Sequence, residues 1–220
     1  MMKNFFKNKN ILITAGPTWV AVDKVRVITN IFGGALGSII AQKGKDVGAK
    51  VTLLMGPGRA ILPKENKNFR IIKFKYYDEL LDLIKKEVGS KKYDIVIHSS
   101  AVADYKPVLT KEPKIKSGKK NLIIKLKPTA KIVDLIKKLD PKIFLVKFKL
   151  EVNLTERQLI DVAYKSMKAS KADLIVANDF KTVIKSHKAF IIDNDKKVRE
   201  INGKDKIAGE LFKVLESKLK

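Results

Sequence analysis

Short apolar runs alternate along the first hundred residues with segments in which apolar residues recur at helical spacing. The runs that predict strands cover residues 10–15, 50–55, 69–74 and 93–98. Helical spacing covers residues 34–47 and 78–88, and Asp78 is placed to cap the second of these helices. Alternation of this kind is typical of a doubly wound, mostly parallel sheet with helices on both faces. We therefore predict a Rossmann-like α/β fold.

The second half of the chain continues the alternation and ends in a predicted hairpin. Helices are expected over residues 130–139, 155–170 and 204–219, and strands over 142–148 and 172–177. The run Thr155-Glu-Arg-Gln158 fits a capping box at the start of its helix. Asn194-Asp195 predicts the turn of a C-terminal hairpin. Because no repeat or linker interrupts the pattern, residues 1–220 are expected to form one domain.

Residues 109–120 break this alternation, because they are rich in lysine and poor in apolar residues. They follow Pro107 and predict a mobile flap. Residues 121–126 alternate apolar and polar positions and predict a short strand that pairs back with the flap.

Composition excludes several kinds of site. The chain has no Cys, which rules out disulfides, thiolate metal sites and a Cys nucleophile. Its two histidines, His98 and His187, are too few and too far apart in sequence for a zinc site. No apolar run approaches the length of a membrane span, and the N-terminus is too polar for a signal peptide. We expect a cytoplasmic protein with no membrane partner.

The formal charge of +24 raises the hypothesis of a nucleic-acid partner. Only five of the 47 basic residues are Arg, however, and the lysines are spread along the chain. Specific recognition of bases and phosphates depends on Arg forks. We interpret the charge as a bias that favours anionic small molecules, with no nucleic acid as partner. A basic Rossmann-like module that binds RNA or another polyanion without catalysis stays as the alternative.

The segment Asp94–Pro107 carries a candidate ligand site. Its apolar strand runs into Ser99, Ser100 and Ala101, and then into a single acid, Asp104. Ligands of open α/β sheets lie at the carboxyl ends of the strands, where small side chains leave room for them. The alternative is a buried strand followed by an ordinary polar turn.

Glycines form a second candidate site, for phosphate. Gly16 directly follows the first strand, while Gly33, Gly34 and Gly37 open the next helix. Glycine lets backbone N–H groups approach an anion, and a helix N-terminus favours negative charge. The spacing matches neither a dinucleotide fingerprint nor a Walker A loop. A tight turn and close helix packing would explain the same glycines.

Four ordered blocks resemble one known family. They are Val25–Gly37, Ala101–Pro107, Lys114–Lys116 and Asp173–Asp179. In this order and spacing they are similar to phosphopantothenate–cysteine ligase, also called phosphopantothenoylcysteine synthetase. The run Phe148-Lys-Leu-Glu151 resembles the free-standing bacterial form most. That form implies no flavin, and a flavin-dependent decarboxylase on a separate chain.

The resemblance implies a reaction of coenzyme A biosynthesis. A nucleoside triphosphate, CTP or ATP, activates the carboxylate of 4'-phosphopantothenate as an acyl-nucleotide and releases pyrophosphate. The amine of cysteine then displaces the nucleoside monophosphate to give phosphopantothenoylcysteine. Mg²⁺ and preorganised donors are expected to dominate catalysis. The family also implies a homodimer with a shared site.

The resemblance also implies roles for individual residues. Asn30 would hold the acyl intermediate, and Arg26 would contact the substrate of the neighbouring subunit. Lys114 would neutralise charge at the α-phosphate. The substrate pocket would include Ser100, Ala101 and Asp104, and the nucleotide site would include Gly16, Gly34, Gly37, Asp104, Lys114, Phe148, Lys165, Lys168 and Asn178. Structural readings remain: Asn30 as a turn cap, Phe148 as core, and the lysines as solvated surface.

Three positions depart from the family pattern. Phe32 stands where a Ser is usual, Lys147 replaces a Gly, and Lys131 replaces an Asp that borders the nucleotide base. An acid accepts from the amino group of cytosine and a lysine cannot, which leaves CTP and ATP open. A third alternative, an NAD(P)-dependent reductase, lacks the expected acid after the strand that ends at Met55.

Overall fold

One mixed sheet organises the computed structural model, which describes residues 2–110, 114–118 and 120–220. Eight strands lie in the order β12-β11-β10-β9-β6-β1-β4-β5. Their bounds are Asn10–Ala15 (β1), Lys50–Met55 (β4), Phe69–Lys73 (β5), Ile95–His98 (β6), Phe144–Glu151 (β9), Leu174–Asp179 (β10), Lys188–Asp193 (β11) and Val198–Asn202 (β12). The pairs from β5 to β10 are parallel, and β11 and β12 add antiparallel to that edge. The predicted fold class and C-terminal hairpin are confirmed.

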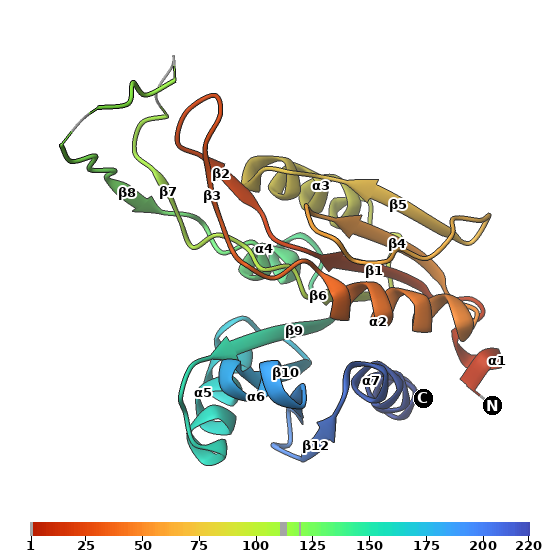
Figure 1. The fold of residues 1–220 in the computed structure, drawn as a ribbon. Coiled ribbons are helices and arrows are strands. Elements are labelled where there is room, and N and C mark those ends of the chain that lie inside the picture. Colours follow the sequence, from red (N-terminus) through yellow and green to blue (C-terminus); the bar gives the residue numbers. More distant parts are fainter. Residues whose placement is uncertain (1, 111–113, 119) are drawn as a thin grey trace.

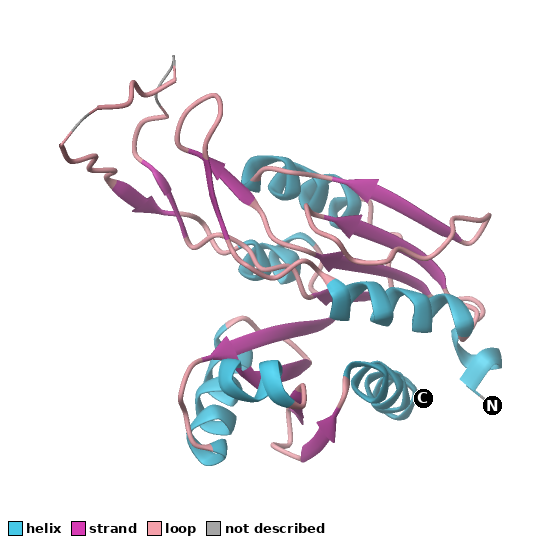
Figure 2. Cartoon of the chain, viewed as in Figure 1, coloured by secondary structure: helices cyan, strands magenta, loops and turns pink. Residues whose placement is uncertain are grey.

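Helices cover both faces of this sheet (Figures 1 and 2). Their bounds are Met2–Phe6 (α1), Ala35–Asp46 (α2), Tyr77–Gly89 (α3), Ile132–Leu139 (α4), Glu156–Ala169 (α5), Phe180–Lys185 (α6) and Lys204–Leu219 (α7). The apolar residues of α1, α2 and α7 pack into one core cluster, and those of α3, α4 and α5 into another. The two clusters follow the alternation of side chains along the strands, as between Val96 and Ile97 of β6.

The helix starts test the capping predictions. The capping box at Thr155 is confirmed, because its hydroxyl accepts from the N–H of Gln158 at 3.3 Å and the Gln158 side chain accepts in return. The prediction for Asp78 is wrong. Helix α3 begins one residue earlier, and the Glu79 carboxylate accepts from the N–H groups of Lys75 and Tyr76 at 2.6 and 3.1 Å. Asp78 lies in the first turn.

Two strand pairs project from the carboxyl edge of the sheet and form what we call the arm, residues 19–29, 105–110, 114–118 and 120–128 (Figure 1). One pair is β2 (Trp19–Ala21) with β3 (Val27–Thr29), and the other is β7 (Tyr105–Pro107) with β8 (Leu126–Pro128). The prediction of a strand over 121–126 is therefore wrong in position, since the paired residues are 126–128. Of the predicted flap, residues 111–113 and 119 lie outside the described residues.

Candidate active site

The chain continues from β1 and β6 as two adjacent segments beyond the sheet. The N–H of Ser99 donates to the carbonyl of Thr14 at 3.1 Å, and the N–H of Ala101 donates to the carbonyl of Gly16 at 3.0 Å. The N–H of Thr18 donates back to the carbonyl of Ala101 at 3.3 Å. These bonds fix residues 99–103 beside residues 14–18, and we call these two segments the floor.

Asn30 is attached to this floor. Its side-chain amide donates to the carbonyls of Ala101 and Val102 at 3.0 and 3.4 Å. The Thr29 hydroxyl, one residue earlier, donates to the carbonyl of Thr18 at 3.1 Å. Three segments that are distant in the sequence therefore meet around an exposed amide side chain.

A buried polar cluster of Thr14, His98 and Ser100 lies at the floor. The Thr14 hydroxyl lies 2.9 Å from Nδ1 of His98 and accepts from the N–H of Ser100 at 3.2 Å. Burial, and then the neighbouring Lys147 ammonium, lower the pKa of His98 to about 4. The imidazole is therefore neutral at pH 7, with one ring nitrogen as a hydrogen-bond donor and the other as an acceptor. The Ser100 hydroxyl oxygen is buried and has no hydrogen-bond partner among the described residues.

Asp104 extends the floor toward the solvent. Its side chain is exposed, and its carbonyl accepts from the N–H of Thr129 at 2.9 Å. The Thr129 hydroxyl donates to the carbonyl of Ala103 at 2.6 Å. The backbone around Asp104 is thus fixed, and its carboxylate is accessible to a ligand.

The glycines at the start of α2 allow this helix to pack closely against the end of β1. Gly34 has φ +82°, and a Cβ there would lie 2.7 Å from the nitrogen of Gly16. A Cβ on Gly37 would lie 2.4 Å from that of Ala15. Close packing is therefore one reason for glycine at positions 34 and 37, which agrees with the alternative of a tight turn and close helix packing. Helix α2 also starts without a side-chain cap, so its first N–H groups remain donors beside the floor.

Phe148 and Asn178 lie on neighbouring strands toward the same edge. Phe148 is partly buried against the core cluster of α2 and α7. Asn178 is 6% exposed, and its amide nitrogen donates to the carbonyl of Lys188 at 2.9 Å. Both therefore have structural contacts in this chain. Phe32 packs edge-on against Phe180 with ring centroids 5.9 Å apart, which gives the unusual aromatic residue a place against α6.

Arg26 and Lys114 lie apart from the floor, in the arm. The Arg26 guanidinium donates to the carbonyl of Ile115, the residue after Lys114, at 3.2 Å. Asn30 lies four positions after Arg26, and the extended chain between them spans roughly 13 Å. The structure therefore brings Arg26 and Lys114 together but does not bring either to Asn30.

Lys165 and Lys168 lie in the C-terminal half of α5. The Lys168 ammonium donates to the side-chain and main-chain oxygens of Asn194 at 3.3 and 3.4 Å. Asn194 lies in the turn after β11. Because β10 and β11 are antiparallel, this turn lies beside the amino end of β10. The structure therefore does not bring Lys168 to the glycines within one chain. Lys165, one turn away, is exposed.

The other two departures from the family pattern, Lys147 and Lys131, lie close enough for their charges to interact. Lys147 is 8% exposed, and its ammonium donates to the Ser166 hydroxyl, the Ser166 carbonyl and the Ser170 hydroxyl at 3.0 to 3.1 Å. Burial lowers the pKa of Lys147 to about 8, Asp134 opposes that shift, and Lys131 adds to it. Lys131 is the exposed N-cap of α4.

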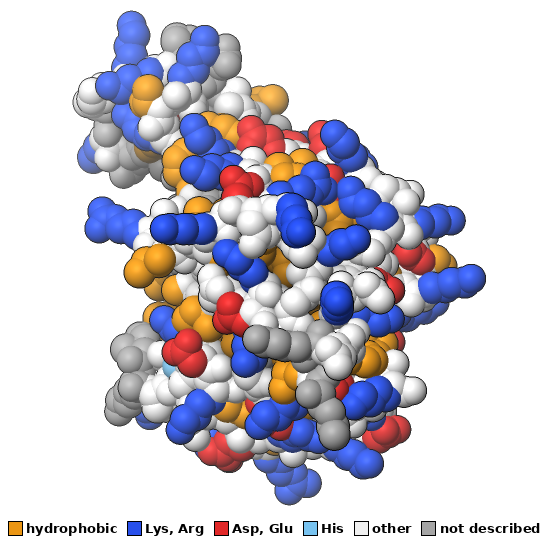
Figure 3. Space-filling model, turned by 90° about the vertical axis from the view of Figure 1, so that its right-hand side faces the viewer, with side chains coloured by type: hydrophobic (Ala, Val, Ile, Leu, Met, Phe, Trp, Pro, Cys, Tyr) orange, Lys and Arg blue, Asp and Glu red, His pale blue; other side chains and the backbone are white. Residues whose placement is uncertain are grey.

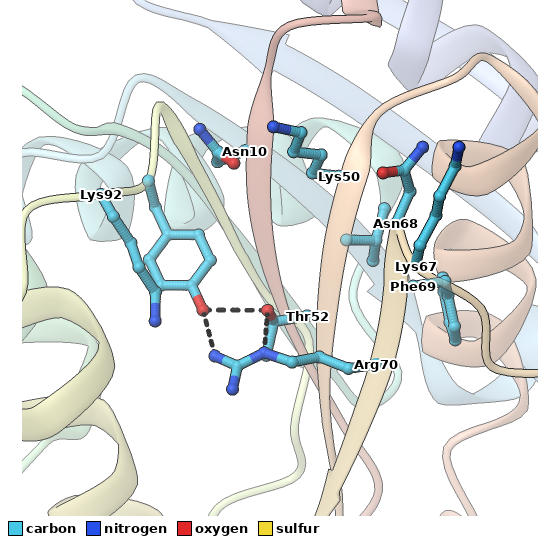
Figure 4. Close-up of a pocket in the computed structure, with 10 residues that line it drawn as sticks. Asn10, Lys50, Thr52, Lys67, Asn68, Phe69, Arg70 and Lys92 are labelled. Carbon is cyan, nitrogen blue, oxygen red and sulfur yellow. Dashed lines mark hydrogen bonds between the residues drawn. The ribbon is translucent and has the colours of Figure 1, made fainter.

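Two hollows lie at opposite edges of the sheet. At the root of the arm, a cavity of about 310 Å³ is lined by residues that include Trp19, Tyr76 and Lys106. At the amino edge, a basic cavity of about 190 Å³ surrounds Arg70, whose guanidinium donates to Thr52 and Tyr93 at 3.0 and 3.1 Å (Figure 4). A Glu87 oxygen lies 2.5 Å from the same guanidinium. The basic cavity is remote from Asn30 and Ala101.

Three further features bear on which partners the chain could bind: its surface charge, its acidic and His side chains, and the polarity of its helices. Lysine and arginine side chains are spread over the whole face in Figure 3. Within residues 2–110, 114–118 and 120–220, no three His, Asp or Glu side chains gather as a metal site. No helix in that part of the chain is long and apolar enough to cross a membrane.

Known proteins resemble the chain along its length. A family model described as DNA/pantothenate metabolism flavoprotein C-terminal domain matches residues 6–219. The coenzyme A biosynthesis bifunctional protein CoaBC of Thermococcus kodakarensis is 39% identical over 175 residues, which are 80% of this chain and 42% of that protein. The chain thus spans less than half of that relative.

Solved structures share the fold. The DNA/pantothenate metabolism flavoprotein from Streptococcus pneumoniae has a TM-score of 0.87 and 33% identity over 96% of this chain and 99% of that one. The C-terminal domain of a CoaBC protein has a TM-score of 0.79 and 28% identity over 98% of each. The resemblance drawn from the sequence motifs is therefore confirmed. The chain belongs to the family of the DNA/pantothenate metabolism flavoprotein C-terminal domain.

Proposed function

We propose that this chain is a phosphopantothenate–cysteine ligase of coenzyme A biosynthesis. The observation that carries the proposal is the placement of Asn30 on the carbonyls of Ala101 and Val102, beside the uncapped start of α2. An exposed amide and a row of free N–H groups suit a substrate with a carboxylate and phosphates. The relative from Thermococcus kodakarensis carries coenzyme A biosynthesis in its name.

The proposed reaction has two steps. The carboxylate of 4'-phosphopantothenate attacks the α-phosphate of CTP or ATP, and pyrophosphate leaves. The amine of cysteine then attacks the acyl carbon, the nucleoside monophosphate leaves, and the amine loses a proton. The Asn30 amide would hold the acyl group for the second step, while Asp104 positions the ligand. His98, neutral and buried, supports the floor without taking part in proton transfer.

Mg²⁺ is proposed to enter with the nucleotide. The described residues offer no cluster of three acidic or His ligands, whereas Mg²⁺ is commonly held by substrate phosphates with one or two carboxylates. Asp104 is the exposed carboxylate on the floor and would be its protein ligand. The ion would neutralise charge on the triphosphate.

A homodimer is part of the proposal, because Arg26 and Lys114 lie in the arm, away from Asn30 of their own chain. The arm also exposes many large apolar side chains, among them Val25 at 65%, Leu109 at 77% and Ile123 at 81%. Exposed apolar surface of this extent favours contact with another protein. We propose that the arm of one subunit completes the site of the other. A separate flavin-dependent decarboxylase would then act on the product, phosphopantothenoylcysteine.

Pyrophosphate release tests the function. The purified chain is incubated with phosphopantothenate, Mg²⁺ and each nucleoside triphosphate in turn, with and without cysteine. We expect release with CTP or ATP that requires phosphopantothenate and accelerates when cysteine removes the intermediate. Binding of RNA that weakens steeply with salt, without any release, would favour the polyanion module instead.

The variant Asn30→Asp separates the two steps. A carboxylate cannot donate to the acyl oxygen or to Ala101 and Val102, so the acyl-nucleotide should form but react slowly with cysteine. We expect one pyrophosphate per site and loss of multiple turnovers by roughly 100-fold, the size seen for removing one oxyanion donor. Multiple turnovers at the native rate would refute the role of Asn30.

A further inference from the structure

The turn between β2 and β3 holds a buried carboxylate. Asp23 is 3% exposed, and its Oδ1 accepts from the N–H groups of Val25 and Arg26 at 2.9 Å each. The other oxygen, Oδ2, accepts from the N–H of Ile115 at 2.9 Å and pairs with the Arg26 guanidinium. One oxygen therefore shapes the turn, and the other reaches a segment 92 residues away.

The same turn satisfies both backbone groups of Ile115. Asp23 accepts from its N–H, and the Arg26 guanidinium donates to its carbonyl at 3.2 Å. The Ile115 side chain is 8% exposed, whereas Lys114 and Lys116 on either side are exposed. Residues 108–110 and 120–128 of the arm are exposed as well. Ile115 is thus an anchor that fixes two lysines at the surface.

The charge of Asp23 suits this contact. The pKa of its carboxyl is lowered to about 2, chiefly by the N–H of Ile115, with the Val25 N–H and the Arg26 guanidinium acting in the same direction against burial. The carboxylate is therefore ionised at neutral pH, and hydrogen bonds to an ionised group are about twice as strong as neutral ones.

We propose that Asp23 is a positioning residue, which holds residues 114–116 against the β2–β3 turn and thereby fixes where Lys114 presents its ammonium to the nucleotide. The inference rests on the proposed function, because Lys114 acts on the α-phosphate only in that reaction. It deepens that function by assigning a role to a residue that would not touch the substrate. It also makes Arg26 and Lys114 a single unit, set by one carboxylate.

The variant Asp23→Asn tests the contact. An amide keeps one acceptor oxygen for the turn, but its NH₂ group would face the N–H of Ile115, so the anchor is lost. Asp82→Asn is the matched control, because Asp82 is 75% exposed on α3 and its removal changes the net charge equally. Ile115→Gly is a second variant, which weakens the anchor in the arm and leaves the sheet untouched.

Two readouts are taken from the same proteins. Limited trypsin digestion, mapped by mass spectrometry, reports cleavage after Lys114 and Lys116. We expect cleavage there to rise at least tenfold in Asp23→Asn and Ile115→Gly, as loss of a charged hydrogen bond predicts, and to stay native in Asp82→Asn. Pyrophosphate release should fall about tenfold in kcat in both arm variants, with KM for phosphopantothenate within about twofold, since Lys114 acts on the reacting phosphate.

The readouts separate the two proposals. Native cleavage rates in both arm variants overturn the role of Asp23 regardless of activity. Faster cleavage with native kcat also overturns it, because the held segment would then have no part in catalysis. If the native chain releases no pyrophosphate at all, the proposed function fails, and the cleavage rates still decide whether Asp23 holds residues 114–116.

Discussion

At the residue scale, Lys147 shows how a charged side chain is accommodated inside this fold. Among the described residues, its amine donates to neutral oxygens of Ser166 and Ser170, in a place where burial disfavours its charged form. The Ser170 hydroxyl also contacts the carbonyls of Ser166 and Met167 at 3.1 Å each. The Ser170 hydroxyl and the Ser166 carbonyl would therefore keep partners without the lysine, and Lys147 lowers the stability of the folded state when it is protonated.

The pH dependence of Lys147→Met tests this account. The pKa of Lys147 is about 8 in the folded chain and 10.5 ordinarily, so the unfolded chain binds more protons between these values. The native free energy of unfolding should therefore rise, relative to that of the variant, as pH increases from 8 to 10.5. Urea unfolding of both proteins at several pH values measures the difference. A difference that is constant or falls with pH would contradict the burial of a charged amine.

The sequence was a good guide to some residues and silent on others. Asn30 and Ala101 were singled out because their blocks resemble a family, and the structure joins them. Asp23 was missed, because the residue that explains it, Ile115, is 92 positions away and neither has a periodic or compositional signal. A lone acid in a turn looks solvated until its distant partner is known.

At the element scale, predictions succeeded where an element buries a full face. The bounds of β1, β4 and α7 are those expected, since long apolar runs and helical spacing define them. The arm strands β2 and β3 were not expected, because they have three residues each and the chain at the start of β2 is held by bonds from Trp19 and Thr18 to the carbonyls of residues 75 and 101. Such strands depend on tertiary contacts rather than on local pattern.

The contact between α2 and β1 gives a prediction at this scale. In Gly37→Ala, the new Cβ would meet Ala15 at 2.4 Å and Ser99 at 2.7 Å, which should cost about 1–3 kcal/mol of stability as overpacking does. Gly209→Ala is the control, because nothing lies within 4 Å of its Cβ and α7 should gain up to about 1 kcal/mol. Chemical denaturation measures both changes. Equal stability of the two variants would refute the close packing of α2.

At the scale of the whole molecule, the predicted site falls into two parts. Asn30, Ala101 and the glycines lie at the edge of the sheet, while Arg26 and Lys114 lie in the arm. One chain does not bring the parts together, and we therefore propose that the arm of a second copy completes the site. Periodicity describes one chain, so the sequence could suggest a shared site only through the family resemblance.

Mixing two inactive variants tests the shared site. Arg26→Gln and Asn30→Asp each damage both sites of their own dimer, but a mixed dimer carries one site with neither change. Co-refolded equal mixtures should recover about a quarter of native turnover, because half of the dimers are mixed and each has one intact site. No recovery, although native mass spectrometry shows mixed dimers, would place both residues in the same site.

The most direct test of the central claim is the mass of the product. The purified chain is supplied with 4'-phosphopantothenate, cysteine, Mg²⁺ and CTP or ATP, and the reaction is analysed by mass spectrometry. We expect one new species whose mass equals phosphopantothenate plus cysteine minus water, formed with one nucleoside monophosphate and absent when any reactant is omitted. Absence of that species with every nucleoside triphosphate, from chain that is folded and dimeric, would contradict the assignment as a ligase.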